Sequence, residues 1–136
     1  ARWPSLAVNY TTKTQYLFRI NKGAHDLSDS ATVNKYVEKN ARPVPFENMI
    51  YIGDGATDIP CFRLVKEQGG LSIAVYTPHT KGARVKSEKY LAEVIIHCVA
   101  PAIYTDGSDI DRIVKAYIER VAACAQLTKL LDEGSR

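Results

Sequence analysis

The sequence predicts an α/β fold in which a parallel β-sheet carries helices on both faces. Short apolar runs at 48–52, 71–76 and 94–99 are typical of strands buried on both faces. Segments with helical spacing of apolar residues alternate with these runs, and parallel strands need such crossovers. The 136 residues are enough for one domain, so we expect residues 1–136 to form part of a single domain.

The first third of the chain is predicted to be irregular apart from short elements. Residues 6–10 (LAVNY) are typical of a short strand. Apolar residues at helical spacing predict a helix over 12–22, and Gly23 is a natural helix stop. The aromatic and β-branched content of 15–20 leaves a strand as an alternative there. A short helix is expected at 32–40, inside a polar connecting region.

The remaining helices follow the apolar runs in order. Residues 59–68 (IPCFRLVKEQ) predict a helix, since proline is tolerated in a first turn. Residues 81–93 predict a charged helix on the surface. Ser108 is expected to cap a long amphipathic helix that ends near Leu131. Its apolar face is predicted to consist of Ile110, Ile113, Val114, Tyr117, Ile118 and Val121.

Composition argues against several classes of protein. The net charge is +3 and the lysines and arginines are scattered, so no basic run indicates nucleic-acid binding. No apolar run is long enough to predict a membrane-spanning helix, and the first residues have no signal-peptide core. Cys61, Cys98 and Cys124 are far apart, which favours reduced, buried thiols over a disulfide framework or a zinc site. We therefore expect a cytoplasmic protein.

The stretch MIYIGDGATDIP, residues 49–60, carries the strongest functional signal. Asp54 follows the first buried strand directly, and Asp58 lies one turn further on, at the start of the next helix. Ligands of open α/β sheets bind beyond the carboxyl ends of the strands, where these two carboxylates can face one point. Hard oxygen donors of this kind suit Mg²⁺, and a helix N-terminus favours a phosphate. The alternative is that Asp58 only caps the helix and Asp54 only shapes a turn.

GDGATDIP, followed by an amphipathic helix and GGLSIAVY, resembles the haloacid dehalogenase-like (HAD) hydrolases, and looks closest to their phosphoserine-phosphatase-like members. The match is to the fourth family motif, with Gly53 and Asp54 followed after three residues by Asp58. The resemblance implies a Rossmann-like core and Mg²⁺-dependent hydrolysis of phosphomonoesters through an aspartyl-phosphate. It implies that Asp54 is the direct magnesium ligand and that Asp58 supports the metal, often through a bound water. Gly55 and Thr57 lie in the same loop, and the resemblance implies that they border the phosphate, although Thr57 stands where relatives often carry Asn.

The resemblance also implies a lysine near a helix start, upstream of this strand, that contacts the phosphate. Lys13 fits this position because it lies in the first turn of the predicted helix 12–22. Lys22 is the alternative, nearer to Asp54 in sequence but at the helix end. We therefore expect Lys13, Asp54 and Asp58 to form the catalytic set, with Lys13 holding the phosphate of a small phosphorylated substrate.

The first family motif, DxDx(T/V), is not found at the end of any strand predicted here. The only DxD is Asp109–Asp111, which reads better as first-turn acids that complement a helix dipole. The resemblance therefore covers the C-terminal half of a family member, and we expect this chain, which begins with Ala1, to belong to a longer protein and to be inactive alone. Without the first-motif strand, the edge at 49–52 is open. The expected partner is the missing N-terminal half, or a second chain paired along that edge.

The residues are also compatible with two other functions. One is a non-catalytic HAD-like module for binding or assembly, which an upstream DxDx(T/V) would argue against. The other is a phospho-acceptor signalling domain in which Asp54 itself is phosphorylated. Such domains usually carry acids near the chain start, and the first 25 residues have none.

Overall fold

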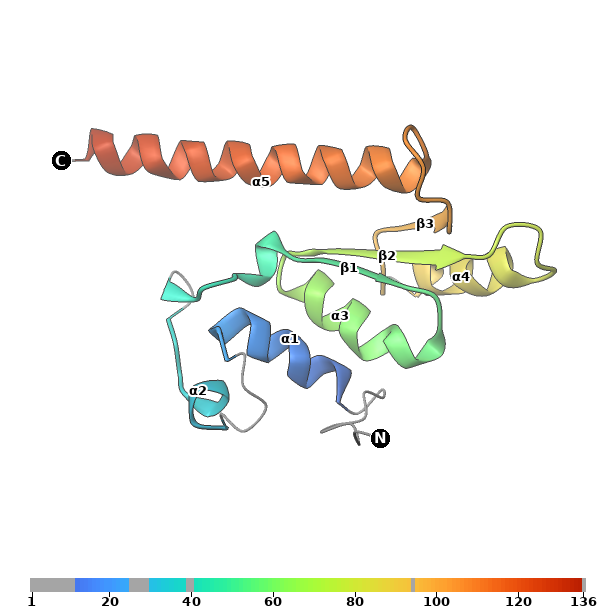
Figure 1. The fold of residues 1–136 in the computed structure, drawn as a ribbon, viewed down its shortest axis with the longest axis horizontal. Coiled ribbons are helices and arrows are strands. Elements are labelled where there is room, and N and C mark those ends of the chain that lie inside the picture. Colours follow the sequence, from blue (N-terminus) through green and yellow to red (C-terminus); the bar gives the residue numbers. More distant parts are fainter. Residues whose placement is uncertain (1–11, 25–29, 39–40, 94, 136) are drawn as a thin grey trace, which may run out of the picture.

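The computed structural model describes residues 12–24, 30–38, 41–93 and 95–135. A three-stranded parallel sheet forms its centre, with the strands in the order β1-β2-β3 (Figure 1). The elements are α1 (Lys13–Lys22), α2 (Ser30–Asn34), the 3-10 turn η2 (Phe46–Asn48), β1 (Ile50–Gly53), the 3-10 turn η3 (Ala56–Asp58), α3 (Ile59–Glu67), β2 (Leu71–Tyr76), α4 (Ala83–Ala92), β3 (Cys98–Pro101) and α5 (Asp109–Gly134). The predicted α/β class with a Rossmann-like parallel sheet is confirmed.

Helices cover both faces of the sheet, as predicted. On one face, Phe62 of α3 and Tyr90 of α4 pack around Ala74 of β2. On the other face, Ile110 of α5 packs against Ile73 and its neighbours. Figure 1 shows α5 above the sheet and α3 and α1 below it. The side chains of β2 alternate between the two cores, which explains why its apolar run is continuous.

The strand β1 differs from the prediction that it is buried on both faces. It stands at one end of the sheet, and its side chains are only partly buried. Ile52 is 38% exposed, whereas Ile73, its neighbour in the register on β2, is fully buried. The physical reason is that no strand among the described residues pairs with the outer side of β1. That a further strand pairs along this edge stays a prediction.

Several element ends differ from the sequence prediction. The strand expected at 94–99 begins only at Cys98, because Ile95 and Ile96 close the turn after α4. Both isoleucines are buried without belonging to a strand, so their apolar character reflects the core alone. The strand expected at 48–52 begins at Ile50, because the 3-10 turn η2 precedes it.

The helices also differ from the sequence prediction in position and extent. Residues 15–20 are helical, so the strand alternative for them is wrong. The short helix expected at 32–40 is displaced, because α2 ends at Asn34. The long helix α5 continues past Leu131 to Gly134, and Ile118 lies away from its apolar face with 57% of its surface exposed. The strand expected at 6–10 lies outside the described residues. Among the described helices, none combines the length and apolar character needed to cross a bilayer.

Candidate functional site

The turn between β1 and α3 folds around the carboxylate of Asp58. Its Oδ2 accepts hydrogen bonds from the backbone N–H groups of Asp54, at 3.1 Å, and Gly55, at 3.2 Å. The residue is 5% exposed, and it ends the 3-10 turn η3 that leads into α3. Asp58 therefore satisfies backbone donors that would otherwise be unpaired at the start of the helix.

Gly53 is required for this arrangement. A Cβ atom at position 53 would lie 2.6 Å from both Cγ and Oδ2 of Asp58, closer than real contacts allow. No atom lies within 4 Å of the corresponding point at Gly55, so space does not demand that second glycine. The first glycine of the GDG motif thus makes room for Asp58, and its role can be tested independently of Asp54.

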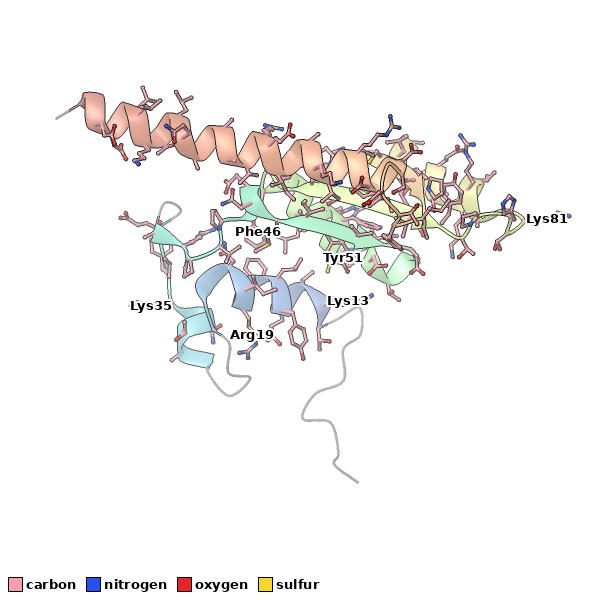
Figure 2. All side chains as sticks on the ribbon, turned by 45° about the horizontal axis from the view of Figure 1, so that its top comes forward. Lys13, Arg19, Lys35, Phe46, Tyr51 and Lys81 are labelled. Carbon is pink, nitrogen blue, oxygen red and sulfur yellow. The ribbon has the colours of Figure 1, made fainter. Side chains whose placement is uncertain are left out.

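Lys13 reaches the same carboxylate from a distant part of the chain. Its Nζ lies 2.7 Å from Oδ1 of Asp58 and 3.2 Å from Oγ1 of Thr57. Lys13 opens α1, whereas Lys22 closes the same helix at its opposite end. Figure 2 shows Lys13 at the end of α1 that lies toward Tyr51. Of the two lysines considered from the sequence, the structure therefore brings only Lys13 to the Asp58 carboxylate.

The position of Lys13 depends on how α1 is anchored. Leu17 packs against a core cluster built around Phe46. The rings of Phe18 and Phe46 meet edge to face with centroids 5.5 Å apart. The buried Asn21 donates its Nδ2–H to the carbonyl of Val44 at 2.7 Å. These contacts fix α1 beside α3 and so direct its first residue at the β1–α3 turn.

Tyr51 completes the surroundings of Asp58, and the sequence analysis did not identify it. Its hydroxyl donates to Oδ1 of Asp58 at 2.7 Å. Its ring stands edge to face against Phe62, with centroids 5.6 Å apart. The available signal was a tyrosine inside an otherwise aliphatic strand, because a hydroxyl at such a position needs a hydrogen-bond partner.

These contacts decide the charge state of Asp58. Burial alone would raise its pKa, but hydrogen bonds from Lys13, Tyr51 and the Gly55 backbone outweigh burial, so the pKa of Asp58 is lowered. Burial and the bond to Asp58 together raise the pKa of Tyr51, which keeps its hydroxyl protonated as a donor. Each oxygen of Asp58 accepts two hydrogen bonds, which uses the roughly four acceptor positions of a carboxylate.

Asp54 differs from Asp58 both in exposure and in hydrogen bonding. Its side chain is exposed, and among the described residues nothing donates a hydrogen bond to its carboxylate. No group of three histidine, cysteine, aspartate or glutamate side chains that could hold a metal occurs among the described residues. Mg²⁺ usually takes only one or two protein carboxylates and completes its shell with water and phosphate oxygens. Asp54 therefore fits direct ligation, whereas Asp58, with its acceptor positions filled, fits a role through water.

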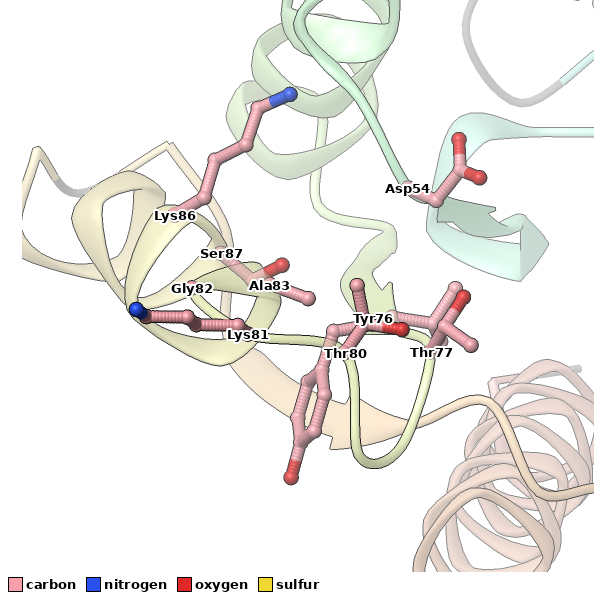
Figure 3. Close-up of a pocket in the computed structure, with 10 residues that line it drawn as sticks. Asp54, Tyr76, Thr77, Thr80, Lys81, Gly82, Ala83, Lys86 and Ser87 are labelled. Atoms are coloured by element: carbon pink, nitrogen blue, oxygen red, sulfur yellow. The ribbon is translucent and has the colours of Figure 1, made fainter.

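A cleft opens beside these residues at the carboxyl ends of the strands. One compartment has a volume of about 420 Å³ and is lined by Lys13, Tyr51, Asp54 and Asp58 together with residues that follow β2 and β3. A neighbouring compartment of about 370 Å³ shares Asp54 and Thr77 with it and extends to the start of α4 (Figure 3). The location agrees with the rule that open α/β sheets bind ligands beyond the carboxyl ends of their strands.

The acids of the DxD sequence lie elsewhere and have local partners. Asp109 pairs with Arg112 at 2.8 Å, and Asp111 pairs with Lys115 at 3.0 Å. Asp111 also accepts from the backbone N–H of Gly107 at 2.9 Å, while Ser108 accepts from the N–H of Asp111. The interpretation of both aspartates as first-turn acids of a long helix is confirmed.

The structure is that of an α/β protein with a cleft, lined by Lys13, Asp54 and Asp58, at the carboxyl ends of a parallel sheet. An uncharacterized protein of Borreliella burgdorferi is 33% identical to this chain over 104 residues, which make up 74% of this chain and 33% of that protein. The chain thus spans about a third of the length of this curated relative. No family model and no solved structure matches the chain. The name of the relative states no activity, so function must be argued from the site itself.

Proposed function

We propose that this chain forms the C-terminal half of a Mg²⁺-dependent HAD-like phosphatase that hydrolyses a small phosphomonoester. The observation that carries the proposal is the ion pair between Lys13 and Asp58, 2.7 Å long and formed across 45 residues of sequence. It lines the same cleft as Asp54, whose carboxylate has no partner among the described residues. A helix cap needs no partner so far away in sequence. A lysine and a free carboxylate at one cleft are what a phosphate and its cation require.

Each residue of the cleft has a separate role in this proposal. Lys13 uses two of its three N–H groups on Asp58 and Thr57, and the third remains for a phosphate oxygen. Asp58 keeps the ammonium group of Lys13 oriented. Asp54 would hold Mg²⁺, and Gly55 and Thr57 would border the phosphate. When bound, Mg²⁺ would neutralise charge that develops on the phosphate oxygens.

The carboxylate that attacks phosphorus would come from outside these 136 residues. The outer side of β1 is the natural place for the strand that carries it, because the backbone there is unpaired among the described residues. The expected partner is therefore a segment of the same longer protein, or a second chain, that adds a strand ending in DxDx(T/V). The chain alone would bind the ligands but would not turn over a substrate, since it lacks the nucleophile.

Ligand binding to the chain tests the metal and phosphate site directly. Calorimetric titration with Mg²⁺, followed by inorganic phosphate in its presence, should show binding of both. Asp54→Asn should weaken Mg²⁺ binding at least about tenfold, equivalent to about 1.4 kcal/mol. Asp106→Asn is the matched control, because Asp106 is also an exposed aspartate that precedes a glycine in a loop. Lys13→Met should abolish phosphate binding.

Equal Mg²⁺ affinity in the Asp54→Asn and Asp106→Asn variants would refute the metal assignment. Phosphate binding that survives Lys13→Met would refute the phosphate assignment. Circular dichroism spectra that match the wild type are needed for each variant, so that a loss of binding is not a loss of fold.

A non-catalytic assembly module is the second candidate, and the exposed edge of β1 favours it. Ile52 is 38% exposed at this edge, where pairing with another strand would cover the backbone. Sedimentation measurements should then show self-association or capture of a partner strand. A strictly monomeric chain that still binds Mg²⁺ and phosphate would support the phosphatase half over this alternative.

A further inference from the structure

The cleft continues past Asp54 into a second compartment that the proposed phosphate site does not use. This compartment has a volume of about 370 Å³ and is bounded by the β2–α4 loop and the first turns of α4. It shares Asp54, Tyr76 and Thr77 with the compartment that contains Lys13. Figure 3 shows Asp54 on one side of the space, with Lys81 and Lys86 on the α4 side. One small molecule can therefore extend from the first compartment into the second.

The second compartment carries an excess of unpaired positive charge. Lys81 and Lys86 line it, and no carboxylate in the described part of the chain forms an ion pair with either lysine. Arg84 on the same helix behaves differently, because its Nε lies 2.7 Å from Oε1 of Glu88. Asp54 is the only acidic residue among those that line the compartment. Two lysines without an ion pair among the described residues line this cavity, and such an excess of positive charge favours an anionic ligand.

The other lining groups are also donors. Thr77 and Thr80 contribute hydroxyl groups to the compartment. The helix α4 starts here without an acidic residue in its first turn and without a side-chain cap on its N-terminus. The start of α5 is the contrasting case, because Ser108 caps it and acids occupy its first turn. The uncapped end of α4 adds to the positive potential of the lysines, although it would not make a site by itself.

We propose that this second compartment binds a second phosphate group, so that the substrate is a small organic bisphosphate. The inference rests on the proposed function, because the phosphate to be hydrolysed occupies the Lys13 compartment. A phosphate monoester carries a charge of about −2 at neutral pH, which matches two ammonium groups better than a carboxylate does. Lysine is a common point-charge partner of phosphate, and hydroxyl groups complete the shell of its oxygens.

Paired phosphonates test the inference on the chain itself, in the presence of Mg²⁺. Propylphosphonate offers one phosphonate group and propylene diphosphonate offers two, on the same carbon chain. Calorimetry should show that the diphosphonate binds about ten times more tightly, as expected for one or two additional charge-assisted hydrogen bonds. The double variant Lys81→Gln, Lys86→Gln should lose this gain and bind propylphosphonate as the wild type does. Lys89→Gln is the matched control, because Lys89 lies on α4 but does not line the compartment.

The outcomes separate the two proposals. If propylphosphonate binding depends on Lys13 and the diphosphonate gains nothing, the second phosphate site is wrong and the proposed function stands. If neither ligand binds in a Lys13-dependent way, the proposed function fails and the inference fails with it. An equal gain from phosphonopropionate, which carries a carboxylate in place of the second phosphonate, would overturn the assignment to a bisphosphate.

Discussion

Two helices of this chain begin beside a pair of aspartates, and the two pairs are held in different ways. The pair at α5 takes its partners from its own turn, since Asp111 contacts Gly107 and Lys115, each four residues away. Before α3, Asp58 also has local partners in the N–H groups of Asp54 and Gly55. It differs in having two further partners from other elements, Lys13 on α1 and Tyr51 on β1. A helix cap is satisfied locally, so the partners from distant segments are what supports the proposed site at Asp58.

The two pairs also differ in which carboxylates have hydrogen-bond or ion-pair partners. At α5 both carboxylates are exposed or partly exposed and both are paired with basic side chains. Before α3, Asp58 is buried and fully hydrogen-bonded, while Asp54 is exposed and has no partner for its carboxylate among the described residues. Exposed ion pairs contribute little to stability, whereas a buried pair is costly to break. Of these four aspartates, Asp54 is thus the one whose carboxylate has no partner among the described residues.

The largest effect is expected from the glycines that precede the two pairs. Gly53→Ala should destabilise the chain by about 3 kcal/mol or more, because the new Cβ would displace the Asp58 carboxylate and break its pair with Lys13. Gly107→Ala should cost about 1–2 kcal/mol, because its φ of +79° is unfavourable for alanine although no atom lies within 4 Å. Urea denaturation followed by circular dichroism measures both. Equal losses would contradict the steric role of Gly53.

The next largest effect is expected from neutralising the acids themselves. Asp58→Asn should lower the free energy of unfolding by about 2–3 kcal/mol, because the charge-assisted bonds from Lys13 and Tyr51 weaken. Asp111→Asn should produce a much smaller change, because its ion pair with Lys115 lies at the surface. The same urea titration measures both variants. A loss for Asp111→Asn as large as that for Asp58→Asn would remove the distinction between the two regions.

The sequence was sufficient to predict the framework and the loop of the site. Continuous apolar runs predicted β2 correctly, and the spacing of Asp54 and Asp58 behind β1 predicted where the cleft lies. The choice of Lys13 over Lys22 as the phosphate-binding lysine stays a prediction, and the structure shows that Lys13 pairs with Asp58. The strand β2 and the spacing of Asp54 and Asp58 are local features, and local patterns determine them, whereas the contact of Lys13 with Asp58 spans 45 residues.

The remaining features depend on tertiary packing that a sequence pattern does not contain. Tyr51 looked like one more apolar strand residue, and its bond to Asp58 exists only because β1 and the following turn fold back on each other. Ile95 and Ile96 resembled a strand because burial, not pairing, selects their apolar side chains. The second compartment draws on residues after β2 and on α4, which only the sheet brings toward Asp54.

The pH dependence of the free energy of unfolding should also differ between Asp58 and Asp111, by less than the substitutions above. The pKa of Asp58 is lowered in the folded chain, so its contribution to stability is complete above its unfolded value of about 3.9. As the pH falls below that value, the unfolded chain takes up a proton first, and the contribution is lost on passing through the folded pKa. Asp58→Asn should therefore flatten the decline of stability below about pH 4. The N–H of Gly107 also lowers the pKa of Asp111. Asp111→Asn should nevertheless flatten the decline less, because the ion pair of Asp111 with Lys115 lies at the surface. Identical profiles would contradict this.

The smallest effect is expected from Tyr51→Phe, which tests whether the distant partners of Asp58 act together. The ring keeps its edge-to-face contact with Phe62, and only the hydroxyl donor to Oδ1 of Asp58 is removed. The free energy of unfolding should fall by about 1 kcal/mol, and the pKa of Asp58 should rise, which moves the acid limb to higher pH. Tyr117→Phe is the control, because its hydroxyl donates to the backbone carbonyl of Glu47, away from Asp58. It should lose similar stability without moving the acid limb, and equal acid limbs in the two variants would show that Tyr51 has no influence on the charge of Asp58.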